Sequence, residues 1–266
     1  MTSPPKSPAS QSKTPPTPKQ LSDTELIERY LADGPPPDTS GLGGPSLPRI
    51  MGPLHNNSPQ VNPADAANYR DGAKAGGFII PGLANEFIDG KEGFTAVICG
   101  EIPNYVEWLP NRGGYAGRYA VDALPKDLEY QTVARGGREQ RAMVRRSSGN
   151  VLEFSLELFL VVDALPFIWS CNNASRLRFA REWSVKYRFL RDPVSGGRLP
   201  SYAHQYRIRS YPVSNSFGSW FSPTAEDLGL LRDEQTYLVA KSLGAFVREG
   251  GNLLDTAAPA LALPAA

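Results

Sequence analysis

The chain has 266 residues, of which 41% are apolar, enough for a hydrophobic core over most of its length. The formal net charge is only +1, but residues 112–209 hold 17 Lys or Arg and 9 Asp or Glu, a balance of +8, which leaves −7 for the rest. Such an asymmetry predicts a basic binding surface. The sequence shows no N-terminal apolar segment and no run of about 18 apolar residues, so we expect a cytoplasmic protein without a membrane anchor.

The cysteine pattern argues against a metal site. Cys99 and Cys171 lie far apart, each inside an apolar run, and only two histidines are present to complete a ligand set. This arrangement favours two buried, reduced thiols over zinc binding. We therefore expect no metal and no cofactor.

Composition divides the chain into three parts. Residues 1–48 contain 11 of the 25 prolines and predict a disordered N-terminal arm, because they cannot bury enough apolar surface to fold. Inside this arm, the segment SDTELIERYLADG (residues 22–34) predicts a short helix capped at Ser22 or Asp23. Residues 49–250 form the predicted folded domain, and residues 251–266 form a predicted flexible tail.

The folded part has mostly the alternating pattern of β-strands. Residues 93–102 and 104–110 predict two strands that are separated or bent at Pro103. Residues 150–165 predict a long, half-buried strand that enters the core, and two further strands are expected at residues 203–213 and 217–223. Several short strands with Gly- and Pro-rich turns favour an all-β core.

Two segments instead show helical spacing. Residues 172–192 begin at a capping Asn172 or Asn173, and residues 232–250 begin with acidic residues and end at a glycine pair. The predicted fold is therefore mainly β with flanking α-helices (α+β). An OB-like small β-barrel or curved sheet is the expected architecture.

Catalytic motifs are weak in this sequence. The glycine pairs lack the Lys and Ser/Thr of a phosphate-binding loop, and neither His55 nor His204 has a nucleophile motif nearby, so we expect no enzyme activity. Glu153 and Glu157 share one face of a predicted strand. With Asp163 they define the alternative of a metal-dependent nuclease, which is the least supported one.

Arginines interleaved with aromatic residues are the clearest functional signal, as in IPNYVEWLPNRGGYAGRYA (residues 102–120). Cations along a groove bind phosphates, and exposed rings stack on unpaired bases, so the pattern predicts sequence-tolerant binding of single-stranded DNA. We assign backbone contacts to Arg112, Arg118, Arg207 and Arg209, and base stacking to Tyr105, Trp108, Tyr115 and Trp220.

Strand parity and helix spacing refine this assignment. Tyr105 and Trp108 have opposite parity on their strand, so they cannot both point into the core. Other aromatic residues are expected to be buried instead. We place Phe154, Phe167 and Trp169 in the core, and Trp183 and Tyr187 on the apolar stripe of the first long helix.

The sequence also resembles a group of bacteriophage early proteins, some of which are assigned as single-stranded DNA-binding proteins. The likeness covers roughly residues 49–249 and rests on spaced motifs, among them YVEW followed by Arg and Gly, PSYAHQYRI (residues 200–208) and GSWF (residues 218–221). The resemblance implies a role in phage DNA replication or recombination. The tail departs from the acidic tail of many single-strand binders, because its only acidic residue is Asp255.

A second reading remains open beside DNA binding. In a virion or assembly protein, the same aromatic residues would form a protein interface, and the Pro-rich arm would be a docking peptide. The sequence leaves open the choice between DNA and RNA, the site size, the protein partners and homo-oligomerisation.

Overall fold

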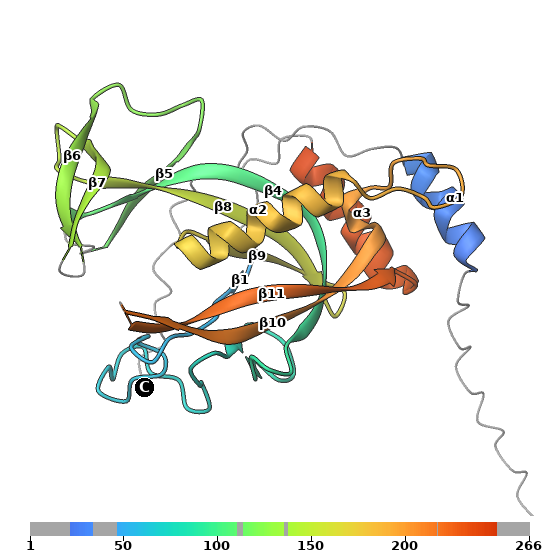
Figure 1. The fold of residues 1–266 in the computed structure, drawn as a ribbon, viewed down its shortest axis with the longest axis horizontal. Helices are drawn as coiled ribbons and strands as arrows, with labels where there is room; N and C mark the ends of the chain where they lie inside the picture. Colours follow the sequence, from blue (N-terminus) through green and yellow to red (C-terminus); the bar gives the residue numbers. More distant parts are fainter. Residues whose placement is uncertain (1–21, 34–46, 111–113, 136–137, 217, 249–266) are drawn as a thin grey trace, which may run out of the picture.

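The computed structural model describes residues 22–33, 47–110, 114–135, 138–216 and 218–248. Over these residues the chain forms mainly β-structure with a few helices (Figure 1). The expected mainly-β class with flanking helices is confirmed. Most of the Pro-rich arm and the whole C-terminal tail lie outside the described residues, so the predictions made for them stay predictions.

The elements follow the chain in this order. The strands are β1 (Arg49–Ile50), β2 (Phe78–Ile79), β3 (Phe87–Ile88), β4 (Phe94–Trp108), β5 (Tyr115–Ala120), β6 (Leu128–Arg135), β7 (Arg138–Arg145), β8 (Val151–Val162), β9 (Leu165–Cys171), β10 (His204–Asn215) and β11 (Gly218–Leu230). The helices are α1 (Asp23–Asp33), α2 (Ala174–Arg188) and α3 (Glu234–Arg248), and a 3-10 turn (Ser201–Ala203) precedes β10.

Nine strands form one sheet that curls into a half-barrel, with the order β1-β9-β8-β4-β10-β11. Strand β5 pairs with the second half of β4, and the β6–β7 hairpin pairs with the start of β8. One end of the sheet is therefore built in the order β6-β7-β8-β4-β5, which we call the five-strand end. In Figure 1 the β6–β7 hairpin lies at the left, far from α1 and α3. This topology does not establish an OB fold.

Strand β4 is continuous through Pro103, so the two predicted segments form one strand and are not separated there. Its first residues pair with β10 and its last residues pair with β5, and Pro103 lies between these two segments. Among the described residues, the edge of β4 that faces away from β8 has no partner strand at Pro103. The missing N–H of proline therefore interrupts no hydrogen-bond ladder on that edge. The irregularity lies instead at Cys99, where the register with β8 shifts between Ile98 and Gly100.

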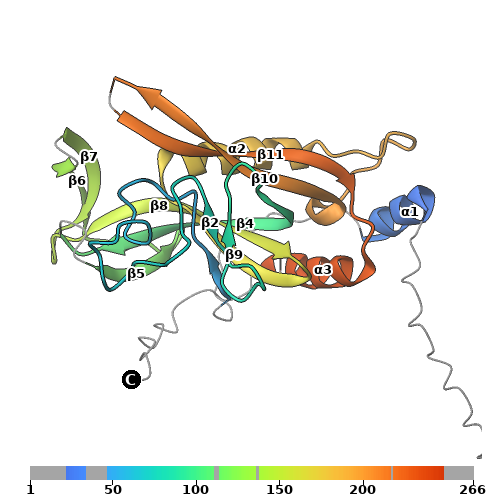
Figure 2. The same ribbon diagram turned by 90° about the horizontal axis from the view of Figure 1, so that it is seen from below.

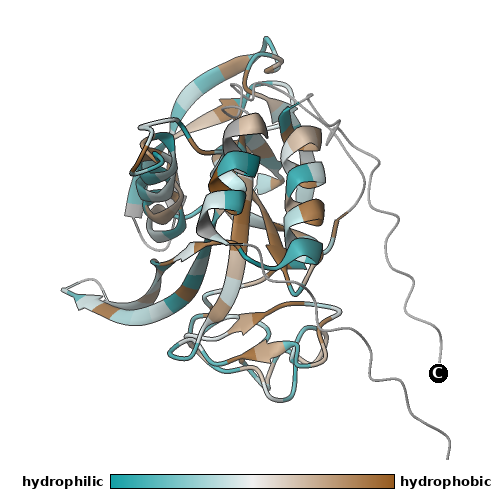
Figure 3. Cartoon of the chain, turned by 90° about the vertical axis from the view of Figure 1, so that its right-hand side faces the viewer, coloured by the Kyte–Doolittle hydropathy of each residue, from teal (hydrophilic) through white to brown (hydrophobic). Residues whose placement is uncertain are grey.

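Each face of the sheet carries its own hydrophobic core. Helix α2 and the β2–β3 segment cover one face, the α2 face, over Leu158 and Trp169. Helices α3 and α1 cover the other, the α3 face, over Phe159 and Ile168. The helices carry hydrophobic and hydrophilic sides, as Figure 3 shows, so each buries one stripe and exposes the other.

All three predicted helices are confirmed. Helix α2 begins where the sequence suggests, because the Asn173 side chain accepts a hydrogen bond from the Arg176 backbone N–H at 2.9 Å. Helix α1 starts with a reciprocal capping arrangement between Ser22 and Glu25. It is docked rather than isolated, since Leu26 is buried in the α3-face core.

Two β-hairpins reach beyond the packed cores. The β6–β7 hairpin pairs with β8 at two positions, Met143 with Leu152 and Val144 with Val151. The β10–β11 hairpin runs beside α2, and its tip extends past the sheet, as Figure 2 shows from below. Both hairpins therefore expose more of their side chains than the central strands do.

Candidate nucleic-acid interface

The aromatic residues of the stretch 102–120 divide between the two faces of the sheet. Tyr105 pairs with Phe154 of β8 and points to the α2 face, where the two rings meet edge to face at 5.5 Å. Trp108 pairs with Val151 and points to the other face, where Tyr115 packs against it. Tyr115 is half exposed, while Tyr105 and Trp108 are partly buried. The predicted difference in orientation between Tyr105 and Trp108 is thus confirmed.

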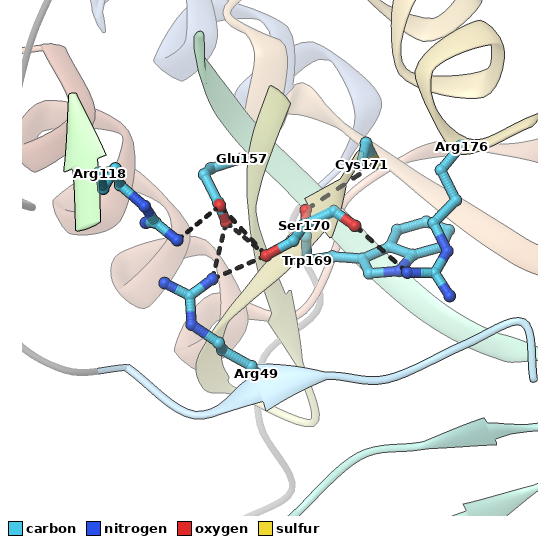
Figure 4. Close-up of polar contacts among 7 residues, drawn as sticks. All are labelled: Arg49, Arg118, Glu157, Trp169, Ser170, Cys171 and Arg176. Atoms are coloured by element: carbon cyan, nitrogen blue, oxygen red, sulfur yellow. Dashed lines mark hydrogen bonds and ion pairs between the residues drawn. The ribbon is translucent and has the colours of Figure 1, made fainter. Parts of the chain in front are cut away.

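Arg118 takes part in a buried ion-pair cluster on the α3 face (Figure 4). Its Nη2 lies 3.0 Å from Glu157 Oε1, and Glu157 is fully buried. Arg49 Nη1 lies 2.9 Å from the other carboxylate oxygen, and the Ser170 hydroxyl donates to Glu157 as well. The positive charge of Arg118 is therefore already neutralised by a buried carboxylate inside the protein.

The remaining predicted residues lie away from this cluster. Arg207 and Arg209 alternate with Tyr206 and Ile208, which point into the α2-face core, so the two arginines point to the opposite face from Tyr105. Arg209 lies 2.9 Å from Glu226, and the Arg207 guanidinium donates to the Glu92 carbonyl at 3.5 Å. The β10 arginines and Tyr105 therefore do not form two walls of one groove.

Trp220 and Arg112 are the two remaining residues of the predicted DNA-binding set. Trp220 is partly buried on β11 opposite Val213, near the tip of the β10–β11 hairpin. Arg112 lies outside the described residues. The structure thus brings Trp108, Tyr115 and Arg118 to one face of the five-strand end, with Tyr105 on the other face.

A second group of rings and arginines gathers on the α2 face of the five-strand end. Tyr130 pairs with Met143, Met143 with Leu152, and Phe154 follows two positions after Leu152 on the same face. Phe154 pairs with Tyr105, and Arg181 reaches Phe154 from α2. We call this group the ring–arginine surface; its members are Tyr105, Tyr130, Arg141, Phe154 and Arg181.

Contacts between rings and guanidinium groups organise the ring–arginine surface. The Arg141 guanidinium lies 4.5 Å from the centre of the Tyr130 ring, which is 61% exposed. The Arg181 guanidinium lies 5.9 Å from the Phe154 ring. Phe154 was expected in the core, but it is only partly buried, since it packs on the core's edge. Both pairs therefore offer a cation beside an accessible ring.

Several other arginines of the basic section are neutralised by carboxylates. Arg145 contacts Glu107 and Asp127, and further ion pairs join Arg146 to Glu129, Arg178 to Glu182, Arg188 to Glu101 and Arg209 to Glu226. Within the described part of the chain, Arg141 and Arg181 have no carboxylate within ion-pair distance. Arg141 and Arg181 are therefore among the cations of this section whose charge is available, and each of them lies beside a ring.

A buried carboxylate supports the five-strand end from within. Glu107 is 1% exposed and accepts hydrogen bonds from the Asn150 amide at 2.8 Å and from the Tyr119 hydroxyl at 2.5 Å. Arg145 contacts both Glu107 and Tyr119. The hydrogen bond to Glu107 raises the pKa of Tyr119, so its hydroxyl remains a donor at neutral pH. These bonds fix β4, β5 and β7 to one another.

The acidic residues of the nuclease alternative do not converge. Glu157 is enclosed by two arginines and a serine, while Asp163 lies in the β8–β9 turn. Among the described residues, no group of three His, Cys, Asp or Glu side chains is placed to hold a metal ion. Burial raises the pKa of Cys99 and of Cys171, which leaves both thiols unreactive.

One element of this surface was missed in the sequence. The β6–β7 hairpin places Arg141 over Tyr130, whereas the sequence indicated only a basic segment there. The sequence does contain a signal for this hairpin. The glycine pair Gly136-Gly137 separates two runs of eight residues, and a glycine pair between two strand-like runs favours a hairpin.

No helix of the described residues is long and apolar enough to cross a membrane. No curated protein and no solved structure matches the chain. The model of the Pam3 phage gp34-like proteins matches residues 45–252, which include the whole sheet, α2 and α3. The chain therefore belongs to the Pam3 phage gp34-like family, a family of phage proteins.

Proposed function

We propose that this phage protein binds single-stranded DNA without strong sequence preference and without catalysis, during phage DNA replication or recombination in the host cytoplasm. The observation that carries the proposal is the ring–arginine surface, where two guanidinium groups without an ion pair among the described residues lie beside one exposed ring and one partly buried ring on one face. Single-stranded DNA is a polymer of phosphates and flat bases, so it matches this alternation.

The chemistry of the surface supports binding to any base. Stacking of a base on an aromatic side chain contributes about 1–3 kcal/mol and is tolerant of sequence, because every base has a π-face. Tyr130 and Phe154 supply such faces, and Arg141 and Arg181 supply charge for the neighbouring phosphates. The proposal shifts the phosphate contacts from Arg118 and Arg209, which have carboxylate partners, to these two arginines.

Binding of a fluorescent oligonucleotide across a salt series tests the proposal. We expect affinity to fall steeply as salt rises, since bound phosphates release counterions. Tyr130→Ala should weaken binding about tenfold at constant salt, because one stacking platform is lost. Tyr211→Ala is the matched control: Tyr211 is also an exposed tyrosine, but it lies on β10, outside the five-strand end.

Two results would contradict the proposal. Binding that is undetectable at low salt would exclude single-stranded DNA as the ligand. Equal losses of affinity in Tyr130→Ala and Tyr211→Ala would show that the ring–arginine surface is not the binding site.

A protein-binding role in virion assembly is the second candidate, and a separate observation favours it. Strand β6 of the projecting hairpin pairs only with β7 among the described residues, so its outer edge presents unpaired backbone groups. An extended segment of another protein can add to such an edge. Stable association with a virion protein at high salt, with no shift of an oligonucleotide, would favour this candidate over DNA binding.

A further inference from the structure

A pocket of about 290 Å³ lies between α2 and the β10–β11 hairpin. The two elements lie side by side in Figures 1 and 2. Apolar walls come from Phe179 and Trp183 of α2, from Leu190, and from Ala225 of β11. The volume lies near the lower end of the range of about 300–1,000 Å³ for small-molecule sites, so any occupant is small.

Two buried polar groups belong to residues that line this pocket. Trp183 and Tyr206 are each 2% exposed, and neither Trp183 Nε1 nor Tyr206 Oη has a hydrogen-bond partner of good geometry among the described residues. Burial, with the Asp227 carboxylate nearby, raises the pKa of Tyr206, so its hydroxyl keeps its proton. The Trp183 indole lies near enough to act as a donor to Tyr206 Oη, so the group that still needs an acceptor is the tyrosine hydroxyl hydrogen.

Unused buried donors of this kind are rare in folded proteins. An unsatisfied buried polar group costs about 1–3 kcal/mol, and most such groups have a protein or water partner. Because Trp183 and Tyr206 line a pocket, a molecule bound in it is one source of the missing acceptor. That molecule has an apolar or aromatic body and at least one hydrogen-bond acceptor on its edge.

The mouth of the pocket supplies acceptors and one cation. Asp227 contributes a carboxylate that also contacts His204 at 2.9 Å, and Glu182 contributes another that pairs with Arg178. Lys186 lines the mouth and has no ion pair among the described residues. A ligand seated here meets donors at its inner end, carboxylates at its rim, and one ammonium group outside.

We propose that this pocket binds a nucleobase. A base has a flat aromatic body, acceptors that Trp183 and Tyr206 can satisfy, and amino or ring N–H groups that can donate to the rim carboxylates. A phosphate attached through the sugar would lie outside, toward Lys186. The acidic rim opposes entry of the phosphate itself, so the base enters and the backbone stays in solvent.

This proposal concerns a different site from the ring–arginine surface and does not depend on it. The base can come from a free nucleoside or from a single strand of DNA, and both sources share the chemistry that the pocket recognises. If the pocket held only water, the donors would be hydrated, and neither nucleosides nor an oligonucleotide would bind in it.

Calorimetric titration of the full-length protein with adenosine, cytidine, guanosine and thymidine tests the free source, and a short oligonucleotide tests the strand source. Tyr206→Phe removes the hydroxyl but keeps the ring, so we expect a loss of about three- to tenfold in affinity for the ligand that binds. Ala225→Leu fills the pocket and should abolish that binding. Tyr211→Phe, a hydroxyl deletion at an exposed position of the same strand, should change nothing.

The outcomes separate cleanly. Nucleoside binding that Tyr206→Phe weakens supports a free base as ligand. Oligonucleotide binding that is weakened by Tyr206→Phe, without nucleoside binding, supports a base from a strand. If neither a nucleoside nor the oligonucleotide binds, or if binding is unaffected by Ala225→Leu, the proposal is overturned. Because Tyr130→Ala tests the ring–arginine surface separately, failure of one site is distinguishable from failure of the other.

Discussion

Arg118 Nη2 lies 3.0 Å from Glu157 Oε1, and this contact joins an edge strand to the buried centre of the sheet. Glu157 is fully buried, and its second oxygen is met by Arg49 from β1. Three strands that are distant in the sequence are therefore held by one carboxylate. A carboxylate in this position stabilises the fold only while its partners remain, because an unpaired buried charge is costly.

The first prediction concerns this cluster. Glu157→Ala leaves Arg118, whose side chain is only 12% exposed, without its carboxylate partner. We expect the free energy of unfolding to fall by about 3 kcal/mol, measured by urea denaturation. Glu226→Ala is the control: it breaks an ion pair with Arg209 in which both side chains are about half exposed, and it should cost at most about 1 kcal/mol. Similar losses in both variants would contradict a structural role for the cluster.

The second prediction separates available from neutralised arginines near the β6–β7 hairpin. Arg141 has no carboxylate partner among the described residues, whereas Arg146 lies 2.6 Å from Glu129. Both substitutions, Arg141→Gln and Arg146→Gln, remove one positive charge. We expect only Arg141→Gln to reduce the salt slope of oligonucleotide binding, by about 0.7, the value for one phosphate contact on a single strand. An equal change in both variants would point to net charge alone.

The sequence predicts the local elements well and the contacts between distant elements poorly. Helix α2 could be predicted because its signals are local: Asn173 caps it, and Trp183 falls on a stripe of regular spacing. The partners of Glu157 could not be predicted in the same way. Arg49 and Arg118 come from two other strands, and only the register of the sheet brings them to one carboxylate.

In the candidate site, too, local features could be predicted and contacts between distant residues could not. Tyr105 and Trp108 could be assigned to opposite faces from strand parity alone, and the structure confirms that assignment. The availability of an arginine depends instead on whether a carboxylate lies nearby in space. Hence Arg118 and Arg141 look alike in the sequence and differ in the fold, where only Arg118 faces an acidic partner.

The third prediction is a pH effect at His55. The Phe221 backbone N–H donates to His55 Nδ1 at 3.4 Å, so the neutral ring serves as an acceptor. Burial, followed by the nearby Arg176 charge, lowers the pKa of His55 in the folded protein. The unfolded chain therefore takes up a proton first as the pH falls. His55 contributes stability above its ordinary pKa of about 6.5, and that contribution is lost as the pH falls through its lowered folded value.

Two measurements check this prediction. An NMR titration should place the His55 pKa below its ordinary value, and His55→Gln identifies its resonance, because the chain has only two histidines. Urea denaturation between pH 7 and pH 5 should then show a smaller loss of stability in His55→Gln than in the unmodified protein. A His55 pKa at or above the ordinary value would refute the assignment.

The fourth prediction concerns a close backbone crossing at Gly90. The Ser210 backbone N–H donates to the Gly90 carbonyl at 2.7 Å, and the Ser210 hydroxyl donates to the Gly76 carbonyl. A Cβ at position 90 would lie 2.0 Å from the Gly76 carbonyl oxygen and 2.3 Å from Ser210 Oγ. Gly90→Ala must therefore push the loop before β4 away from the backbone at Gly76 and from Ser210 of β10.

We expect Gly90→Ala to lower the free energy of unfolding by about 3 kcal/mol, the upper end of the usual cost of overpacking, since the obstructing atom is backbone. Gly117→Ala is the matched control, because its Cβ would meet only ordinary contacts of 3.6 Å or more in strand β5. Thermal unfolding of the two variants compares them directly. A midpoint for Gly90→Ala that matches that of Gly117→Ala would mean that the loop moves away from β10 without cost. The crossing would then have no part in holding β10 against the β2–β3 segment.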